Sequence, residues 1–406
     1  MNLEEMKRKY AYTLAKVGLN VQKGQTVLVE ANVAGAAFVP VFAEECYKLG
    51  AGNVVVHYLD LATMKVAAQY RPDEDIRKVE NWEKEMHQQY LDEGACYVRL
   101  ESEDPKLMED ISEKNSNAIF AHVDAVRNIM RAASREKHCQ WLIATVPTQR
   151  WAEYILDKVG LEAEEALWEL IFKLCYITED NDVVETWNQR DKVKAARGKA
   201  VDDLHLTKLH YTSGNGTDLT VGLTPWSKFG RGERKMPANF VPFHANIPSE
   251  EICTSPDKFV TEGVVYASKP LVLGGKKIEN FGFRFEKGKV VEVIAKEGKE
   301  MLEALIATDE NSCYLGEAAL VEYHSPISMS GVVYFTTLID ENASCHLALG
   351  RCLGKGGPEE EQYRFNDATI HVDFMIGTSD MKIVGTTESG EEVTIFENGD
   401  FAIDVG

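Results

Sequence analysis

The sequence predicts two domains of different fold class: an α/β domain with a mostly parallel sheet over residues 1–190, and a β-rich α+β domain over residues 191–406. A chain of 406 residues is long enough to form two cores. In the first range, β-branched runs alternate with segments of helical periodicity, which is typical of βαβ units. In the second range, short segments alternate at period two between turn signals. A charged helical stretch over residues 180–203 marks the boundary.

The first domain begins with a strand–helix–strand unit. Thr26–Glu30 is a short β-branched run, Ala36–Leu49 is apolar at helical spacing, and Asn53–Tyr58 is a second buried run. Two strands joined by one helix form a parallel pair with a right-handed crossover. Further strands are expected at Cys96–Leu100 and Trp141–Thr145. This order of elements predicts the α/β architecture.

The second domain is expected to consist mainly of strands, with one helix over Gly298–Ala307. Its segments alternate apolar and polar residues, so each would bury one face. The predicted strands are Leu206–Thr212, Asp218–Gly222, Thr261–Ala267, Phe281–Phe285, Val290–Ile294 and Gly331–Phe335.

Composition excludes several classes of partner. The chain has 44 Lys and Arg against 65 Asp and Glu, a net charge of −21, which disfavours nucleic acids and anionic membranes. No apolar run approaches the ~20 residues of a membrane span. The N-terminus reads as an amphipathic helix without the apolar core of a signal peptide. The eight cysteines form no CxxC pair. We therefore expect reduced thiols and a cytoplasmic location.

The segment His371-Val-Asp373 is the most informative motif. In an extended strand, residues i and i+2 point to the same face, so His371 and Asp373 would project together. An imidazole beside a carboxylate on rigid strand backbone suits a borderline divalent metal such as zinc or cobalt. The alternative is a buried ion pair within a strand.

Three further segments contain ionisable residues in apolar surroundings, where they are costly unless paired or metal-bound. The pair Glu250-Glu251 precedes Ile-Cys, Glu317 lies in Leu-Gly-Glu-Ala-Ala-Leu, and His346 follows Cys345. The alternatives are that Glu317 caps a helix and that His346 is a core histidine with a satisfied partner. Taken together, the motifs offer three carboxylates and two imidazoles. Two adjacent divalent cations need such a set, with positions left for water and substrate.

Long ordered segments across nearly the whole chain resemble the M29 family of metallo-aminopeptidases, the aminopeptidase T and aminopeptidase S group. The segments that carry the resemblance are Gly18–Leu28, Gly216–Leu223, Ser325–Ser328 and His371–Gly377. The resemblance implies five metal ligands: Glu251, Glu317, His346, His371 and Asp373. The choice of Glu251 over Glu250 rests on its spacing to Glu317.

The resemblance also implies an activity, a cofactor and an assembly. It implies hydrolysis of N-terminal residues from peptides with a free N-terminus, through a dinuclear centre and a bridging hydroxide. The two divalent ions per chain would be zinc or cobalt, with manganese or magnesium as alternatives. A homodimer is expected on the same ground. Glu250, or else Glu251 or Glu317, would shuttle the proton to the leaving amine.

One position departs from the family pattern. The family has a tyrosine seven residues after its first ligand histidine, and that tyrosine would donate a hydrogen bond to the developing oxyanion. This chain has Leu353 there. Loss of one such donor costs on the order of 10²–10³ in turnover. Tyr363, on the following Gly- and Glu-rich loop, is a candidate replacement, and the alternative is a surface aromatic.

Three other interpretations stay open. The cations Arg231, Arg234 and Lys235 would orient a peptide carboxylate or carbonyl, or would form a solvated turn. A mononuclear iron ring-cleaving dioxygenase of related fold needs only two histidines and one carboxylate. A non-catalytic relative with a vestigial site is the third. No Gly-x-Ser-x-Gly or HExxH motif is present, so serine hydrolase and thermolysin-type chemistry have no support.

Overall fold

The computed structural model describes residues 2–102, 104–136, 139–230, 234–235, 241–274 and 276–403. The chain divides into two compact units. The first unit comprises Met1–Asn188, Glu233–Pro248 and Gly274–Lys276, and the second comprises Gln189–Gly232, Ser249–Leu273 and Lys277–Gly406. That residues 1–190 and 191–406 fold as independent domains stays a prediction.

The first unit is built on a five-stranded parallel sheet in the order β2-β1-β3-β4-β9. Its strands are β1 (Thr26–Asn32), β2 (Asn53–Leu59), β3 (Cys96–Glu101), β4 (Trp141–Thr145) and β9 (Asn246–Ile247). The first four contain the predicted strands. The short strand β9 comes from a distant part of the sequence and had no sequence signal.

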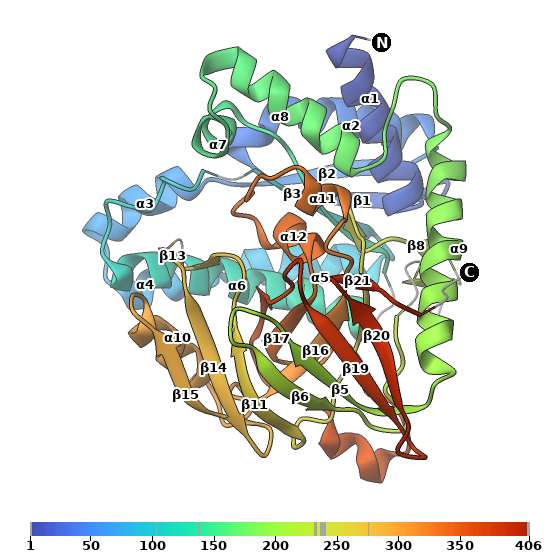
Figure 1. Ribbon diagram of the computed structural model, residues 1–406. Helices are drawn as coiled ribbons and strands as arrows, with labels where there is room; N and C mark the ends of the chain where they lie inside the picture. The colour runs from blue at the N-terminus through green and yellow to red at the C-terminus, as the bar shows by residue number, and fades with distance from the viewer. Residues whose placement is uncertain are drawn as a thin grey trace. The chain divides into compact units, whose positions relative to one another are not determined.

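Helices cover both faces of this sheet, with α1, α2, α7 and α8 on one side and α3 to α6 on the other (Figure 1). They are α1 (Leu3–Thr13), α2 (Val39–Lys48), α3 (Leu61–Tyr70), α4 (Asp73–Arg77), α5 (Asn81–Asp92), α6 (Glu113–Glu136), α7 (Gln149–Ile155) and α8 (Gly160–Leu174). Among the described residues, no helix is both long enough and apolar enough to cross a membrane.

An aromatic cluster fixes α1 and α8 on their face of the sheet. The ring of Tyr10 lies 5.6 Å from Phe38 and 5.9 Å from Trp168 between centroids, and its hydroxyl donates a 2.8 Å hydrogen bond to the carbonyl of Thr145 at the end of β4. Such offset and edge-on pairs add to the free energy gained by burying the rings. The α/β class predicted for this part of the chain is confirmed.

The second unit consists mainly of two antiparallel sheets. The eight-stranded sheet has the order β15-β14-β11-β6-β5-β19-β20-β21 (Figure 1), and the four-stranded sheet has the order β10-β16-β17-β18. The larger sheet contains β5 (Leu206–Thr212), β6 (Asp218–Gly222), β11 (Thr261–Tyr266), β14 (Phe281–Glu286), β15 (Lys289–Ala295), β19 (Lys382–Thr387), β20 (Glu392–Glu397) and β21 (Asp400–Phe401). The smaller contains β10 (Ile252–Thr254), β16 (Leu315–Leu320), β17 (His346–Gly350) and β18 (His371–Met375). The β-rich class is confirmed.

The core of the second unit lies between these two sheets. Phe283 of β14 packs edge-on against Phe374 of β18, with 5.2 Å between ring centroids, and Leu347 and Leu349 of β17 belong to the same cluster. One face of the four-stranded sheet is therefore buried against apolar side chains. Alternate residues of its strands point to the other face, where polar side chains can gather.

Few helices accompany these sheets. They include α9 (Val183–Asp202), whose residues from Gln189 onward belong to this unit, and α10 (Lys299–Ile306). Both confirm predicted helices. The shorter helical segments are α11 (Pro326–Met329), α12 (Thr337–Asp340), η3 (Glu341–Ala343) and η4 (Glu359–Arg364).

The predicted strand over Gly331–Phe335 is wrong. This segment is a loop that leads into α12. Its amides bond to a side chain instead of a neighbouring strand: the amides of Tyr334 and Thr336 donate to the two carboxylate oxygens of Asp340, at 2.9 and 3.2 Å. A short apolar run has the same composition in a strand and in such a loop, so the pattern alone could not separate them.

Candidate metal centre

The five predicted metal ligands all lie on the four-stranded sheet or directly before it. Glu251 precedes β10, Glu317 lies in the middle of β16, and His346 and His371 are the first residues of β17 and β18. Asp373 follows two residues after His371 on β18. The two histidines therefore occupy strands that are neighbours in the sheet although a long loop separates them in sequence.

Strand register places these residues on one face. Glu317 lies opposite Ala348, which in turn lies opposite Asp373, while His346 lies opposite Ala319. Directly paired residues of an antiparallel sheet share a face. The residues between them, such as Leu347 and Phe374, point to the apolar core. The face away from the core is the one that carries the carboxylates and imidazoles.

The carboxylate of Glu317 lies between the two histidines. Its Oε1 is 3.7 Å from Nε2 of His346, and its Oε2 is 3.2 Å from Nε2 of His371. Glu251 approaches His346 from the other side, with 3.1 Å between Oε2 and Nε2, and Asp373 approaches His371 at 3.4 Å. Two groups of three potential ligands result, and both contain Glu317: one with Glu251 and His346, the other with His371 and Asp373.

Backbone carbonyls orient both imidazoles. Nδ1 of His371 lies 2.6 Å from the carbonyl oxygen of Arg351, and Nδ1 of His346 lies 3.3 Å from that of Ser344. A carbonyl accepts a hydrogen bond, so Nδ1 carries the proton in both rings. Nε2 is then turned to the carboxylates, as in histidines that bind metals through Nε2.

Burial and charge together make the face favourable for cations. Burial alone would lower the pKa of His346, but the carboxylates of Glu251 and Glu317 hold that pKa well above its usual range. Burial likewise opposes the charge on His371, and Asp373 raises the pKa of that imidazole. Glu317 is 3% exposed, and although burial would raise the pKa of its carboxyl, His346 and His371 hold it well below the usual range. Oxygen and imidazole ligands in such a field suit zinc, cobalt and manganese.

Two glycines allow the ligand-bearing strands to approach each other. A Cβ at Gly316 would lie 2.1 Å from the carbonyl oxygen of Gly350, and β16 has a register irregularity between Leu315 and Glu317. Gly350 itself has φ of +100°, and a Cβ there would lie 2.3 Å from the carbonyl oxygen of Ile370. No other residue fits either position without moving backbone.

The two predicted catalytic residues outside the ligand set have different surroundings. The side chain of Glu250 is 9% exposed and forms an ion pair with Arg190, with 2.5 Å between Oε2 and Nη2. Tyr363 lies on η4, is 62% exposed, and packs against Phe259 with 6.1 Å between ring centroids. Leu353 is 43% exposed.

The predicted cation cluster lies largely outside the described residues. Arg231 is not described, and of Arg234 and Lys235 only the backbone is, as the short strand β7 that pairs with β8 (Pro242–Phe243). The proposed role of these cations stays a prediction.

Sequence reasoning missed Glu341 and Asn342, which lie on η3 shortly before His346. Glu341 is 9% exposed, and burial followed by the charges of Asp373 and Glu251 raises the pKa of its carboxyl well above the usual range. The adjacent acids Asp340 and Glu341 in a mainly apolar run were a usable signal, of the same kind that identified Glu317.

Comparison with known proteins identifies the family and the fold. Residues 3–401 match the family described as thermophilic metalloprotease (M29). The chain is 36% identical to aminopeptidase AmpS of Bacillus subtilis over 402 residues, 97% of both proteins. The solved structure of wild-type AmpT from Thermus thermophilus matches with a TM-score of 0.91 and 31% identity, and the match covers 99% of this chain and all of that one. The structure of a 2,5-dihydroxypyridine dioxygenase from Pseudomonas putida shares the fold at 14% identity and a TM-score of 0.52.

Proposed function

The chain belongs to the M29 family of metalloproteases, and from this membership we infer that it is a metal-dependent aminopeptidase. Its similarity to AmpS and to AmpT extends over almost the full length of each protein. The dioxygenase is a distant relative in fold, and at 14% identity its activity does not transfer to this chain.

We propose a dinuclear centre that contains two divalent ions. The observation that carries this proposal is the position of Glu317, whose two carboxylate oxygens face two different imidazoles. A shared carboxylate is the usual link between two ions ~3.5–4 Å apart. The proposed ligands are Glu251 and His346 for one ion, His371 and Asp373 for the other, and Glu317 for both. Zinc or cobalt suits this oxygen and nitrogen set, with manganese or magnesium as alternatives.

When bound, such a pair of ions lowers the pKa of a shared water and polarises the scissile carbonyl. The chain's own residues supply position and charge. The carbonyls of Arg351 and Ser344 hold the two imidazoles in orientation. The carboxylates of Glu251, Glu317 and Asp373 produce a negative field at one face of the sheet. Because two divalent ions carry more charge than three carboxylates, the α-amino group of a peptide would enter as a neutral ligand at an open position, which supports substrates with a free N-terminus.

Two further groups are proposed to act on the reacting atoms. Glu250 is proposed as the residue that transfers a proton to the leaving amine, because it directly precedes the ligand Glu251; in this role its carboxylate would have to leave Arg190. Tyr363 is proposed as the donor to the oxyanion, in place of the family tyrosine that Leu353 replaces here.

We also propose a homodimer in the cytoplasm. The eight cysteines are free thiols, which fits a reducing compartment. Light scattering at micromolar concentration should return twice the chain mass of 45.4 kDa, and a value near one chain mass would remove the dimer. If the predicted domains 1–190 and 191–406 fold independently, each range expressed alone should unfold in a cooperative transition of its own.

The test of function uses purified protein loaded separately with zinc, cobalt, manganese or magnesium. We expect two ions per chain by elemental analysis, and hydrolysis of aminoacyl-p-nitroanilides but not of their N-acetylated counterparts. Equal turnover of the acetylated substrates would contradict recognition of the free N-terminus. If the protein bound one iron per chain and cleaved a dihydroxypyridine ring, it would be an oxygenase and the aminopeptidase proposal would be wrong.

A further inference from the structure

Glu250 and Glu251 are adjacent in sequence but differ in their partners. The Glu251 carboxylate lies 3.1 Å from Nε2 of His346 in the candidate metal centre. The Glu250 carboxylate instead pairs with Arg190 of α9, with 2.5 Å between Oε2 and Nη2, and both side chains are largely buried. A short charge-assisted contact of this kind is among the stronger side-chain interactions.

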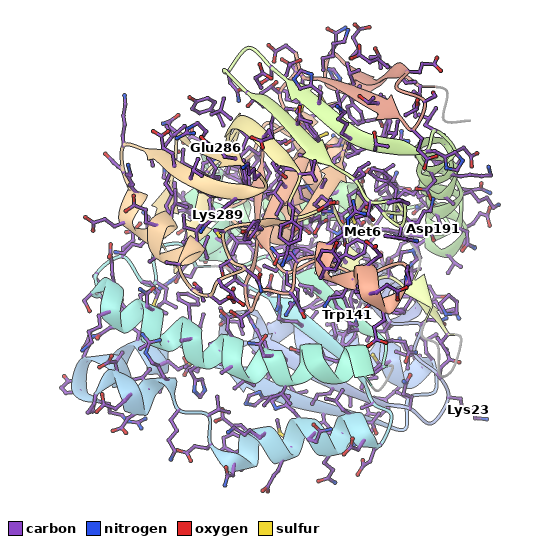
Figure 2. All side chains as sticks on the ribbon, turned by 90° about the horizontal axis from the view of Figure 1, so that it is seen from below. Met6, Lys23, Trp141, Asp191, Glu286 and Lys289 are labelled. Atoms are coloured by element: carbon purple, nitrogen blue, oxygen red, sulfur yellow. The ribbon has the colours of Figure 1, made fainter. Side chains whose placement is uncertain are left out.

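A second cation of the same helix reaches the same segment. Lys194 lies one turn after Arg190, its side chain is 2% exposed, and its Nζ donates to the carbonyl oxygen of Ser249 at 3.3 Å. It also lies 4.0 Å from a carboxylate oxygen of Asp191, the residue labelled on this helix in Figure 2. Residues i and i+4 share one face of a helix, so Arg190 and Lys194 approach Ser249 and Glu250 together.

The other side of the segment is held by Asn342. The amide N–H of Glu250 donates to Oδ1 of Asn342 at 2.6 Å, and Nδ2 of Asn342 donates to the carbonyl of Leu338 at 3.1 Å. Asn342 is fully buried and lies four residues before His346. The Glu250 backbone is thereby connected to the segment that carries His346, and the Glu250 side chain is connected to α9.

We propose that Arg190 is a positioning residue of the metal centre, which acts through Glu250 to fix the carboxylate of Glu251. The inference rests on the proposed dinuclear site. In a protein without Arg190, the buried carboxylate of Glu250 would lose a short charged contact. It would then compete with Glu251 for the metal ion. The Glu251 carboxylate would then no longer be held at His346, and the ion between them would bind less tightly.

The experiment measures metal affinity directly, by competition with a fluorescent chelator, for zinc in the full-length protein and in Arg190→Gln. Loss of a residue that orients a metal ligand typically weakens affinity by about 10–100-fold. We expect a loss in this range for one of the two ions. Excess zinc should then restore kcat to within a few-fold of the parent. Arg190→Lys keeps one positive charge without the fork of donors, and should retain more affinity than the glutamine variant.

The matched control is Arg197→Gln on the same helix. Arg197 pairs with Glu322 at 2.5 Å, and its side chain is as buried as that of Arg190, at 18% against 21% exposed. Unlike Glu250, Glu322 is not adjacent in sequence to a proposed ligand, so zinc affinity should be unchanged in this variant.

Three outcomes would overturn the proposal. One is unchanged affinity for both ions in Arg190→Gln, and another is an equal loss in Arg197→Gln. The third is a loss of kcat that excess zinc does not restore while affinity stays normal, since Arg190 would then act on the proton transfer and not on the metal. Failure of the proposed function is seen separately, because the unsubstituted protein would then bind fewer than two ions or leave the peptide substrate intact.

Discussion

Ala348 of β17 lies directly opposite Asp373 of β18, and Glu317 lies on its other side. Glu317, Ala348 and Asp373 thus form one row across three strands, with the small side chain of Ala348 between the two carboxylates. Ala348 is fully buried. A branched side chain at this position would occupy the volume that the ligands and ions need.

We therefore expect Ala348→Val to weaken zinc binding by at least tenfold, because forcing methyl groups into a packed site costs about 1–3 kcal/mol. Ala348→Gly is the control, since it removes a methyl group and leaves the space. Chelator competition measures the affinity, and thermal unfolding of the metal-free proteins checks that both fold. Equal zinc affinity in the valine variant and the parent would show that this row does not line the metal site.

His371→Ala should abolish metal binding and activity together, because the imidazole is a proposed ligand and its loss leaves Asp373 without its 3.4 Å neighbour. Elemental analysis after dialysis and the peptide assay measure the two effects. His324→Ala is the control: His324 also pairs with a carboxylate, that of Asp400, but it is more than half exposed. If metal content were unchanged and activity within a few-fold of the parent, His371 would be a packed histidine only.

Part of this site could be predicted from local sequence and part could not. His371 and Asp373 share a face because strand periodicity is a local property, and β18 covers both. The contact of Glu317 with both histidines depends on the register of three strands, which periodicity does not specify. The resemblance to a known family supplied these residues. The partner of Glu250 is Arg190, and no local pattern connects two residues that meet only through tertiary packing.

A buried charge network in the first unit should make stability depend on pH. Glu30 is 5% exposed, and its two oxygens accept from Nε of Arg127 and from the hydroxyl of Tyr97, both at 2.9 Å. Burial would raise the pKa of Glu30, but Arg127 and Arg99 hold it below its usual value. A depressed pKa stabilises the folded state above the unfolded-state pKa of about 4.3, and this stabilisation is lost as pH falls through the folded-state value.

Glu30→Gln should accordingly flatten the decline of stability below about pH 5. It should also destabilise the protein at pH 7 by about 3–5 kcal/mol, because it leaves Arg127 buried without its carboxylate. Urea unfolding at pH 7 and pH 4 measures both effects. Glu44→Gln is the control, since the Glu44 carboxylate pairs with Lys48 at the exposed surface and should matter little. If the free energy of unfolding fell equally with pH in the Glu30 variant and in the parent, this network would not be the cause of the pH dependence.

The last prediction concerns the oxyanion donor. The family resemblance places Leu353 where a tyrosine is expected, and the leucine side chain has no donor. A hydroxyl aimed at the developing charge acts only in the transition state, so Leu353→Tyr should raise kcat with little change in KM. The gain should stay below the roughly 10²–10³ that one well-placed donor supplies, because the new hydroxyl is not positioned by surrounding contacts. Leu353→Phe is the control, since it adds the ring without the hydroxyl.

Tyr363→Phe separates the two candidates for this role. Tyr363 already has a phenol, but its ring packs against Phe259 and is 62% exposed. If its hydroxyl reaches the oxyanion, Tyr363→Phe should lower kcat by a factor on the order of 10²–10³, and Leu353→Tyr should be neutral or harmful, because the position is already served. If Leu353→Tyr raises kcat and Tyr363→Phe does not lower it, the parent protein lacks the oxyanion donor because position 353 is leucine. Unchanged kcat in both variants would mean that neither residue donates, so the charge would have to be stabilised by the metal ions alone.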